Sequence, residues 1–335
     1  MSKISVALCT YNGAEFLSEQ LDSYLAQTRL PDELIVGDDC SSDETAKIIT
    51  DFARDAPFPV DLKTNRQNLG STENFARTIS RCRGDIIFLS DQDDIWLPEK
   101  VEKLTAEFAD SPNVGLVFSD AEIVDKNLAS LNHKLSDLTF SPQIRQAVEK
   151  KMFFEFLLLR SYVTGATMAF RAEFRDKFLP FPLDIPKMIH DAWIAFVIVA
   201  NADFRFVDEV LVKYRQHDGQ QLGIFVKNDF ENLSRNEHYA KVLELSRQTK
   251  IRVEKILREI NERPQMFVQK DLIETTASNE IDKLEQKIFH HEVRKNLPRL
   301  RIKRIAPVVK ELFSGRYHKI SRGFLSAAKD LFENI

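Results

Sequence analysis

The chain has 335 residues, of which 43% are hydrophobic and 29% are charged, with a formal net charge of −4. This composition is typical of a globular protein with a full core, and it excludes the overall positive field of a nucleic-acid-binding protein. The cysteines Cys9, Cys40 and Cys82 lack the paired spacing of a zinc site, which favours a reducing compartment, the cytoplasm. The longest apolar run, 192–200, is too short to span a bilayer.

Apolar runs alternate with helical patterns in the N-terminal part of the chain. Strands are predicted at 4–9, 33–37, 60–63 and 86–89, and helices at 16–25, 46–49 and 71–79. Strands and helices that alternate at this spacing predict an α/β fold with a mostly parallel, doubly wound sheet. Ligands of such sheets bind beyond the carboxyl ends of the strands.

Polar side chains follow three of these strands at the same predicted edge. They are, in chain order, Thr10 and Tyr11, then Asp38 and Asp39, then Asp91, Asp93 and Asp94. Clustered carboxylates at the end of a buried strand are stable if water reaches them or if a divalent cation binds, and Mg²⁺ and Mn²⁺ prefer oxygen ligands. A solvated acidic turn would explain the three carboxylates after the fourth strand if they stood alone. The convergence of polar groups from three strands at one edge instead favours a binding site.

Two common nucleotide-binding motifs are absent. The turn 9–13 is not the glycine fingerprint of a dinucleotide fold, and no P-loop occurs. Tyr11 instead offers an aromatic ring on which a base can stack. Two functions of a nucleotide-binding site stay open at this point: a sugar-1-phosphate nucleotidyltransferase, and a non-catalytic protein that binds a nucleotide sugar or a glycan.

Four motifs resemble those of the family 2 glycosyltransferases with the GT-A fold, and most closely the bacterial rhamnosyltransferase-like branch. They are Ser5–Asn12, Asp38–Asp43, Asn68–Gly70 and Ser90–Trp96, in the order and approximate spacing of the family. The resemblance implies a GT-A catalytic domain at 1–223, with a nucleotide-sugar half at 1–125 and an acceptor half at 126–223. It also implies a metal-dependent, inverting transfer of a hexose, possibly rhamnose, from a UDP- or dTDP-linked donor. The acceptor would be a glycan or a lipid-linked sugar of a bacterial surface polysaccharide.

The same resemblance assigns roles to residues at the sheet edge. Asp39 matches the aspartate that binds the nucleobase, and Thr10 and Tyr11 lie where the family contacts the base. Asp91 is expected to lie on the ribose side or the metal side of the bound donor. Asp93 matches the residue that contacts the diphosphate-bound cation, Mn²⁺ or Mg²⁺.

The segment 126–223 carries further candidates, each with a structural alternative. Gly165 either lets the backbone approach the acceptor or serves only a turn. Asp191 lies in the first turn of an apolar helix, where an aspartate is commonly a cap, but an inverting transferase needs a carboxylate base and the resemblance places it here. Trp193 either stacks on a sugar or packs the helix. In the polar turn 215–220, the resemblance implies that Arg215 contacts the diphosphate and that His217 is a metal ligand.

The remainder of this segment predicts a strand at 114–118, a turn-rich stretch at 127–142, a buried helix at 153–159, and strands at 163–170, 204–207 and 210–214. From residue 224 onward the sequence is predominantly helical, with long helices expected at 228–262 and 268–289. These helices are expected to pack on the catalytic domain or on a second subunit, so a homo-oligomer is an open alternative.

The tail 294–335 is basic and amphipathic, because Lys and Arg outnumber Asp and Glu and apolar residues lie between them. Such a pattern predicts a peripheral anchor on an anionic membrane, here the inner face of the cell membrane. The alternative is a set of helices that pack on the protein and leave their charges in water.

Overall fold

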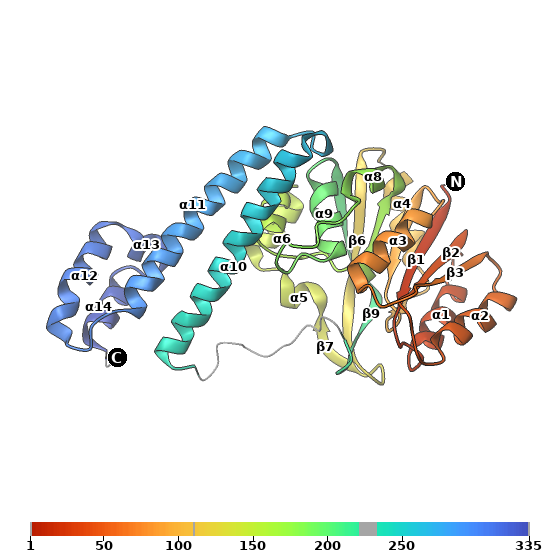
Figure 1. Cartoon of the computed structure of the whole chain (residues 1–335), viewed down its shortest axis with the longest axis horizontal. Coiled ribbons are helices and arrows are strands. Elements are labelled where there is room, and N and C mark those ends of the chain that lie inside the picture. Colours follow the sequence, from red (N-terminus) through yellow and green to blue (C-terminus); the bar gives the residue numbers. More distant parts are fainter. Residues whose placement is uncertain (1, 110, 221–232, 334–335) are drawn as a thin grey trace. The chain divides into compact units, whose positions relative to one another are not determined.

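The computed structural model describes residues 2–109, 111–220 and 233–333 (Figure 1). The chain forms two compact units. The N-terminal unit comprises Met1–Leu183, Lys187–Phe225 and Arg263–Gln269, and the C-terminal unit comprises Asp184–Pro186, Val226–Glu262 and Lys270–Ile335. The predicted boundary between residues 223 and 224 lies outside the described residues.

The first half of the N-terminal unit is a parallel α/β layer, as predicted. Its strands are β1 (Ile4–Thr10), β2 (Glu33–Asp38), β3 (Val60–Thr64) and β4 (Ile86–Ser90), in the order β3-β2-β1-β4. The connecting helices are α1 (Leu17–Leu25), α2 (Thr45–Asp55) and α3 (Ser71–Arg81). Strands β1 and β4 are buried along their whole length, which explains why their sequences are mostly apolar and do not alternate with polar residues.

The second half of the sheet is mixed in direction. Strand β8 (Met168–Arg171) runs antiparallel between β4 and β6 (Val114–Asp125), and β9 (Asp203–Gln216) runs parallel to β6. The short β5 (Ile95–Trp96) pairs antiparallel with β9, and β7 (Ser130–Lys134) pairs with β6. The sheet is therefore parallel in its first half and mixed in its second, whereas the sequence predicted a mostly parallel sheet.

Three segments differ from their sequence-based expectation. The strand expected at 163–170 is a 3₁₀ turn, η1 (Gly165–Thr167), followed by the shorter strand β8. The two strands expected at 204–207 and 210–214 are one strand, β9, because register shifts against β6 around Asp120 accommodate the exposed residues Asp208 and Glu209 without ending the ladder. The stretch 127–142, expected to be turn-rich, contains β7 and the short helix α5 (Leu135–Thr139).

The remaining helices of this unit cover the second half of the sheet. They are α4 (Lys100–Ala109), α6 (Pro142–Glu149), α7 (Phe154–Leu159), α8 (Arg175–Phe178) and α9 (His190–Val199), with 3₁₀ turns η1 (Gly165–Thr167), η2 (Ala172–Phe174) and η3 (Pro264–Met266). Helix α9 is buried on all sides from Ala192 to Ile198, in agreement with its uninterrupted apolar sequence. The core brings together side chains of β1, β2, β4, α1 and α4, among them Leu8, Val36 and Phe88.

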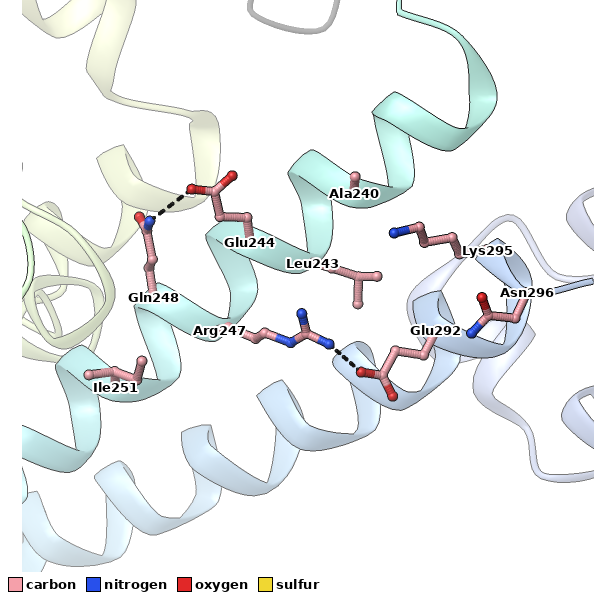
Figure 2. A pocket seen from close by; sticks show the side chains of 9 residues that line it. All are labelled: Ala240, Leu243, Glu244, Arg247, Gln248, Ile251, Glu292, Lys295 and Asn296. Carbon is pink, nitrogen blue, oxygen red and sulfur yellow. Dashed lines mark hydrogen bonds and ion pairs between the residues drawn. The ribbon is translucent and has the colours of Figure 1, made fainter.

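The C-terminal unit is helical. It contains α10 (Arg235–Glu262), α11 (Lys270–Lys295), α12 (Arg301–Phe313), α13 (Arg316–Ile320) and α14 (Phe324–Phe332). Helices α10 and α11 pack along each other, with ion pairs from Arg247 to Glu292 and from Lys250 to Glu285. A hollow of about 420 Å³ lies between them (Figure 2), and the Arg247–Glu292 pair crosses one side of it.

The last three helices pack around a small core and a buried ion cluster. Val308, Tyr317 and Ala327 form the apolar part. Asp330 is buried and accepts hydrogen bonds from Arg294 Nε at 2.6 Å and from the Tyr317 hydroxyl at 2.7 Å. None of the helices in the described part of the chain has the length and apolar character that crossing a bilayer needs.

Candidate functional site

The carboxyl ends of β1, β2 and β4 lie side by side, because the register pairs Thr10 with Asp38 and Leu8 with Ser90. Thr10 is buried, and its hydroxyl donates to Asp38 Oδ1 at 2.9 Å. The backbone N–H of Asp39 donates to the Thr10 carbonyl at 2.8 Å. The structure thus brings together the strand ends that the sequence singled out.

The carboxylate of Asp39 holds the turn that precedes α3. It accepts hydrogen bonds from Asn65 Nδ2 at 3.0 Å, from Leu69 N at 2.9 Å and from Gly70 N at 2.8 Å. Gly70 has a φ of 82°, a conformation that favours glycine. Asp39 therefore shapes the rim at the end of β2, and its predicted contact with a nucleobase stays a prediction.

Gln92 connects the ends of β1 and β4, a role that no sequence motif indicated. Its Oε1 accepts from Tyr11 N at 2.8 Å, and its Nε2 donates to the Tyr11 carbonyl at 3.0 Å. A Cβ atom on Gly13 would lie 2.1 Å from Gln92 Oε1, so a larger residue there would displace the Gln92 amide from Tyr11. With its backbone held in this way, the Tyr11 ring remains 48% exposed at the rim.

The acidic turn after β4 concentrates negative charge in a largely buried place. Burial, together with repulsion from the nearby Asp93 and Asp191 carboxylates, raises the pKa of Asp91 to about 8, although Lys100 opposes the rise. Burial, followed by repulsion from Asp93 and Asp91, also raises the pKa of Asp94. Asp94 accepts a hydrogen bond from Arg215 N at 3.1 Å, so one of its roles is to fix the turn against β9.

Lys100 is a buried cation beside this turn that sequence reasoning missed. Its Nζ donates to the Ala166 carbonyl at 2.6 Å and lies 3.5 Å from the centroid of the Trp96 ring. Burial lowers the pKa of its ammonium, and the Asp94 and Asp91 carboxylates counteract this. One signal was present in the sequence: Lys100 is the first residue of α4, where the helix dipole disfavours a cation.

Lys100→Met is expected to destabilise the protein by about 3 kcal/mol, because it leaves buried carboxylates and the Ala166 carbonyl without their partner. Urea unfolding followed by circular dichroism measures this loss. Lys103→Met in the same helix is the matched control. Its ammonium pairs with exposed Glu99 and Glu209 and should contribute less than about 1 kcal/mol. Equal losses in both variants would contradict a special role for Lys100.

Arg215 lies at the end of β9 and is fully buried, at 1% exposed. Its Nε donates to the Asp93 carbonyl at 2.7 Å, its Nη1 to the Lys126 carbonyl at 2.5 Å, and its Nη2 to Glu19. Its guanidinium also lies over the Phe16 ring, at 4.5 Å from the centroid. These partners, all within the protein, show that Arg215 fixes the acidic turn. Its predicted contact with a diphosphate stays a prediction.

His217 meets the acidic turn directly. Its Nε2 lies 2.9 Å from Asp93 Oδ2, and both side chains are 15% exposed. The described residues contain no group of three or more His, Cys, Asp or Glu side chains that could hold a metal ion. A carboxylate and an imidazole nevertheless suit Mn²⁺ or Mg²⁺ when diphosphate oxygens and water supply the remaining ligands. The Asp93–His217 pair therefore fits a cation that binds together with a donor.

Asp191 occupies the first turn of α9 and is oriented by the backbone around it. Its Oδ2 accepts from Gly165 N at 3.0 Å, and its Oδ1 accepts from Ala192 N at 2.6 Å. Because Lys100 binds the next carbonyl of η1, that of Ala166, the turn links the acidic cluster to Asp191. Gly165 thus contacts Asp191 through its N–H and is itself buried.

His190, which precedes this aspartate, is a core residue. It stacks on Phe75 with ring centroids 3.9 Å apart. Burial lowers its pKa to about 3, so the imidazole is neutral at physiological pH.

Trp193 belongs to the core and not to an acceptor site. Its side chain is 1% exposed, and its Nε1 donates to the Phe178 carbonyl at 3.0 Å. A ring buried in this way cannot stack on a sugar. This burial favours the alternative that the sequence left open, packing of the helix.

Comparison with known proteins supports one family. The family model "Glycosyl transferase family 2" matches residues 5–176, just over half of the chain. The chain is 27% identical to an uncharacterized glycosyltransferase of Nostoc sp. over 64% of its length and 65% of that protein. It is 25% identical to the dTDP-rhamnosyl transferase RfbG of Shigella flexneri, over 70% of this chain and 81% of RfbG. The chain thus spans less than two thirds of some of the curated relatives it matches.

Solved structures agree in fold. TarS 1–349 of S. aureus, in complex with UDP-GlcNAc, is similar with a TM-score of 0.51 and 17% identity, over 93% of this chain and 92% of that one. The mannosyltransferase PcManGT of Pyrobaculum calidifontis, in complex with GDP-Man and Mn²⁺, is similar with a TM-score of 0.50 and 15% identity, over 99% of this chain and 88% of PcManGT. The predicted GT-A fold is confirmed, with a mixed sheet, flanking helices and a helical C-terminal region. Because the family model matches more than half of the chain, the chain belongs to glycosyl transferase family 2.

Proposed function

We propose that the protein is a metal-dependent, inverting glycosyltransferase that moves a hexose from a nucleoside-diphosphate sugar to an acceptor hydroxyl. The observation that carries the proposal is the cluster at the sheet edge, where Asp93 and His217 lie 2.9 Å apart beside Asp91 and Asp191. This cluster combines a cation-binding pair with a separate oriented carboxylate, which are the two parts that such a transfer requires.

The donor is proposed to be UDP- or dTDP-linked, with dTDP-rhamnose as one candidate. The Shigella relative is named a dTDP-rhamnosyl transferase, and TarS was solved with UDP-GlcNAc. In this proposal the exposed Tyr11 ring, Thr10 and the turn shaped by Asp39 receive the base. The nucleotide-sugar half comprises residues 1–125 and the acceptor half residues 126–223.

Asp93 and His217 are proposed to hold a Mn²⁺ or Mg²⁺ ion, with Asp91 on the ribose or metal side. When bound, the ion offsets the negative charge that develops on the diphosphate as the bond to the sugar breaks. PcManGT, similar in fold, was solved with Mn²⁺. Arg215 contributes indirectly in this proposal, because it fixes the Asp93 carbonyl and Asp94.

Asp191 is the proposed catalytic base. Two backbone N–H groups, of Gly165 and Ala192, orient its carboxylate. It accepts the proton of the acceptor hydroxyl as that oxygen attacks the anomeric carbon, on the face opposite the departing diphosphate. The acceptor is proposed to be a glycan or a lipid-linked sugar of a bacterial surface polysaccharide, on the cytoplasmic side of the membrane.

A thermal-shift screen of nucleoside diphosphates and sugar nucleotides, with and without Mn²⁺, tests the proposal. UDP or dTDP is expected to raise the melting temperature in the presence of Mn²⁺, and chelation with EDTA is expected to remove most of this shift. Release of sugar from the matching donor should follow the same preference. Release of pyrophosphate from a nucleoside triphosphate would instead identify a nucleotidyltransferase, and binding without any turnover would identify a non-catalytic protein.

A further inference from the structure

Helix α12 exposes an apolar face that is distinct from the face by which it packs in the C-terminal unit. Its inward face carries Arg304, Val308 and Glu311, all buried. A second face has the helical spacing i, i+3, i+7, i+11 and consists of Ile302, Ile305, Val309 and Phe313. Of these, Phe313 is 88% exposed and Ile302 is 77% exposed. An apolar stripe that lies in water along three turns of helix needs an explanation.

Helix α14, which packs against α12, repeats this arrangement. Ala327 and Asp330 face inward and are buried. Phe324, Leu325 and Phe332 are exposed, and Leu325 is 75% exposed. Helices α12 and α14 therefore each pack in the unit through one face and expose a second, apolar face to solvent.

The charges around these faces are almost all of one sign. Two cations of the tail are buried and have partners inside the unit. Arg294 pairs with Asp330, and Arg304 donates to the carbonyls of Pro298 and Glu333. The exposed cations between residues 299 and 333 are Arg299, Arg301, Lys303, Lys310, Lys319, Arg322 and Lys329. In the same stretch Glu311 and Asp330 are buried, and Glu333 is the exposed carboxylate.

We propose that the exposed apolar faces of α12 and α14 insert into the interfacial region of an anionic lipid membrane. Apolar side chains suit the acyl boundary, and the surrounding Lys and Arg suit the negative headgroups. A second copy of the chain fits less well, because a symmetric contact would bring like charges together. Nucleic acid phosphates would bind the cations, but nucleic acid would not bury the exposed Ile, Leu and Phe side chains.

This inference specifies the membrane contact of the proposed function, so its test uses the full chain and separates lipid binding from nucleotide binding. Flotation is compared on vesicles of phosphatidylcholine alone and on vesicles that also contain phosphatidylglycerol. The apolar variant combines Ile302→Ser, Phe313→Ser and Phe324→Ser. The charge variant combines Lys303→Glu and Lys310→Glu. The matched controls carry exposed residues of the N-terminal unit: Leu183→Ser with Val268→Ser, and Lys63→Glu with Lys150→Glu.

The full chain and both controls are expected to bind the anionic vesicles and not the neutral ones. The apolar variant should lose at least about a hundredfold in affinity, because three inserted side chains no longer leave water. The charge variant should lose about thirtyfold or more, since each Lys or Arg near an anionic surface contributes about fivefold. Circular dichroism and UDP or dTDP binding should be unchanged in all variants, which makes a failure here distinct from a failure of the proposed enzyme function.

Three results would overturn the inference. Equal vesicle binding by the apolar variant and the full chain would mean that nothing inserts. A sedimentation profile in which the full chain is a dimer and the apolar variant a monomer, without vesicle binding, would assign the faces to a second copy. Binding to RNA or DNA in place of vesicles, lost only in the charge variant, would assign the cations to a nucleic acid.

Discussion

Asp191→Asn is expected to lower kcat for sugar transfer by about 10²–10⁴-fold, the range of a general base, while the affinity for the nucleotide stays unchanged. Asn keeps the size of the side chain, and its amide oxygen can still accept one of the hydrogen bonds from Gly165 N and Ala192 N. What it loses is the ability to take up the proton of the attacking hydroxyl. The loss should therefore appear in turnover and not in donor binding.

The measurement must separate this role from that of an ordinary helix-end aspartate. Asp271 offers the matched control, because it lies in the first turn of α11 as Asp191 lies in the first turn of α9. Each Asn variant should cost about 0.3–1 kcal/mol of stability through the helix dipole, and Asp271→Asn should leave kcat intact. Full turnover by Asp191→Asn would remove this residue as the base and restore the interpretation as a cap.

Asp93→Ala is expected to abolish the gain in UDP or dTDP affinity that Mn²⁺ provides, and to reduce turnover accordingly. Asp93 faces His217 at 2.9 Å, and its replacement leaves the imidazole as a single weak ligand. Mutation of a residue that only hydrogen-bonds to a metal ligand lowers metal affinity by about 10–100-fold. Loss of a direct ligand should therefore reach at least the upper end of that range. His217→Ala should show the same change in direction, since both side chains serve one cation.

Calorimetry with and without Mn²⁺ measures the effect. The control is Asp85→Ala, because Asp85 is an exposed aspartate at the opposite end of β4, where its carboxylate accepts from Lys3 N at 2.8 Å. In that variant the enhancement by Mn²⁺ should be intact. Undiminished enhancement in Asp93→Ala would show that the acidic turn does not hold the cation, and the proposed mechanism would lose its basis.

The position of the candidate site was predictable because it depends on local signals. The apolar runs of β1, β2 and β4 end in polar residues, and parallel strands joined by helices bring their carboxyl ends to one edge. Thr10, Asp39 and Asp91 were found for this reason. Helix α9 was also evident, since Ala192–Ile198 is continuously apolar.

Other features required contacts between distant parts of the chain. His217 and Asp93 are separated by 124 residues and meet only because β9 pairs with β5 directly after the acidic turn. Sequence patterns do not reveal which side chains are buried. They therefore left the role of Trp193 open and gave no sign that Arg215, expected to contact the diphosphate, is buried. Lys100 was missed because its partner is a backbone carbonyl of the distant η1 turn.

By itself, then, the sequence determined the parallel half of the sheet, the edge where the candidate site lies and the amphipathic character of the tail. These follow from local periodicity, which a strand or a helix expresses wherever it lies. The tertiary structure alone decided the mixed half of the sheet, the partners of Arg215 and Lys100, and which tail cations lie inside. Burial and hydrogen bonding at those positions depend on segments that are remote in the chain, and no local pattern encodes them.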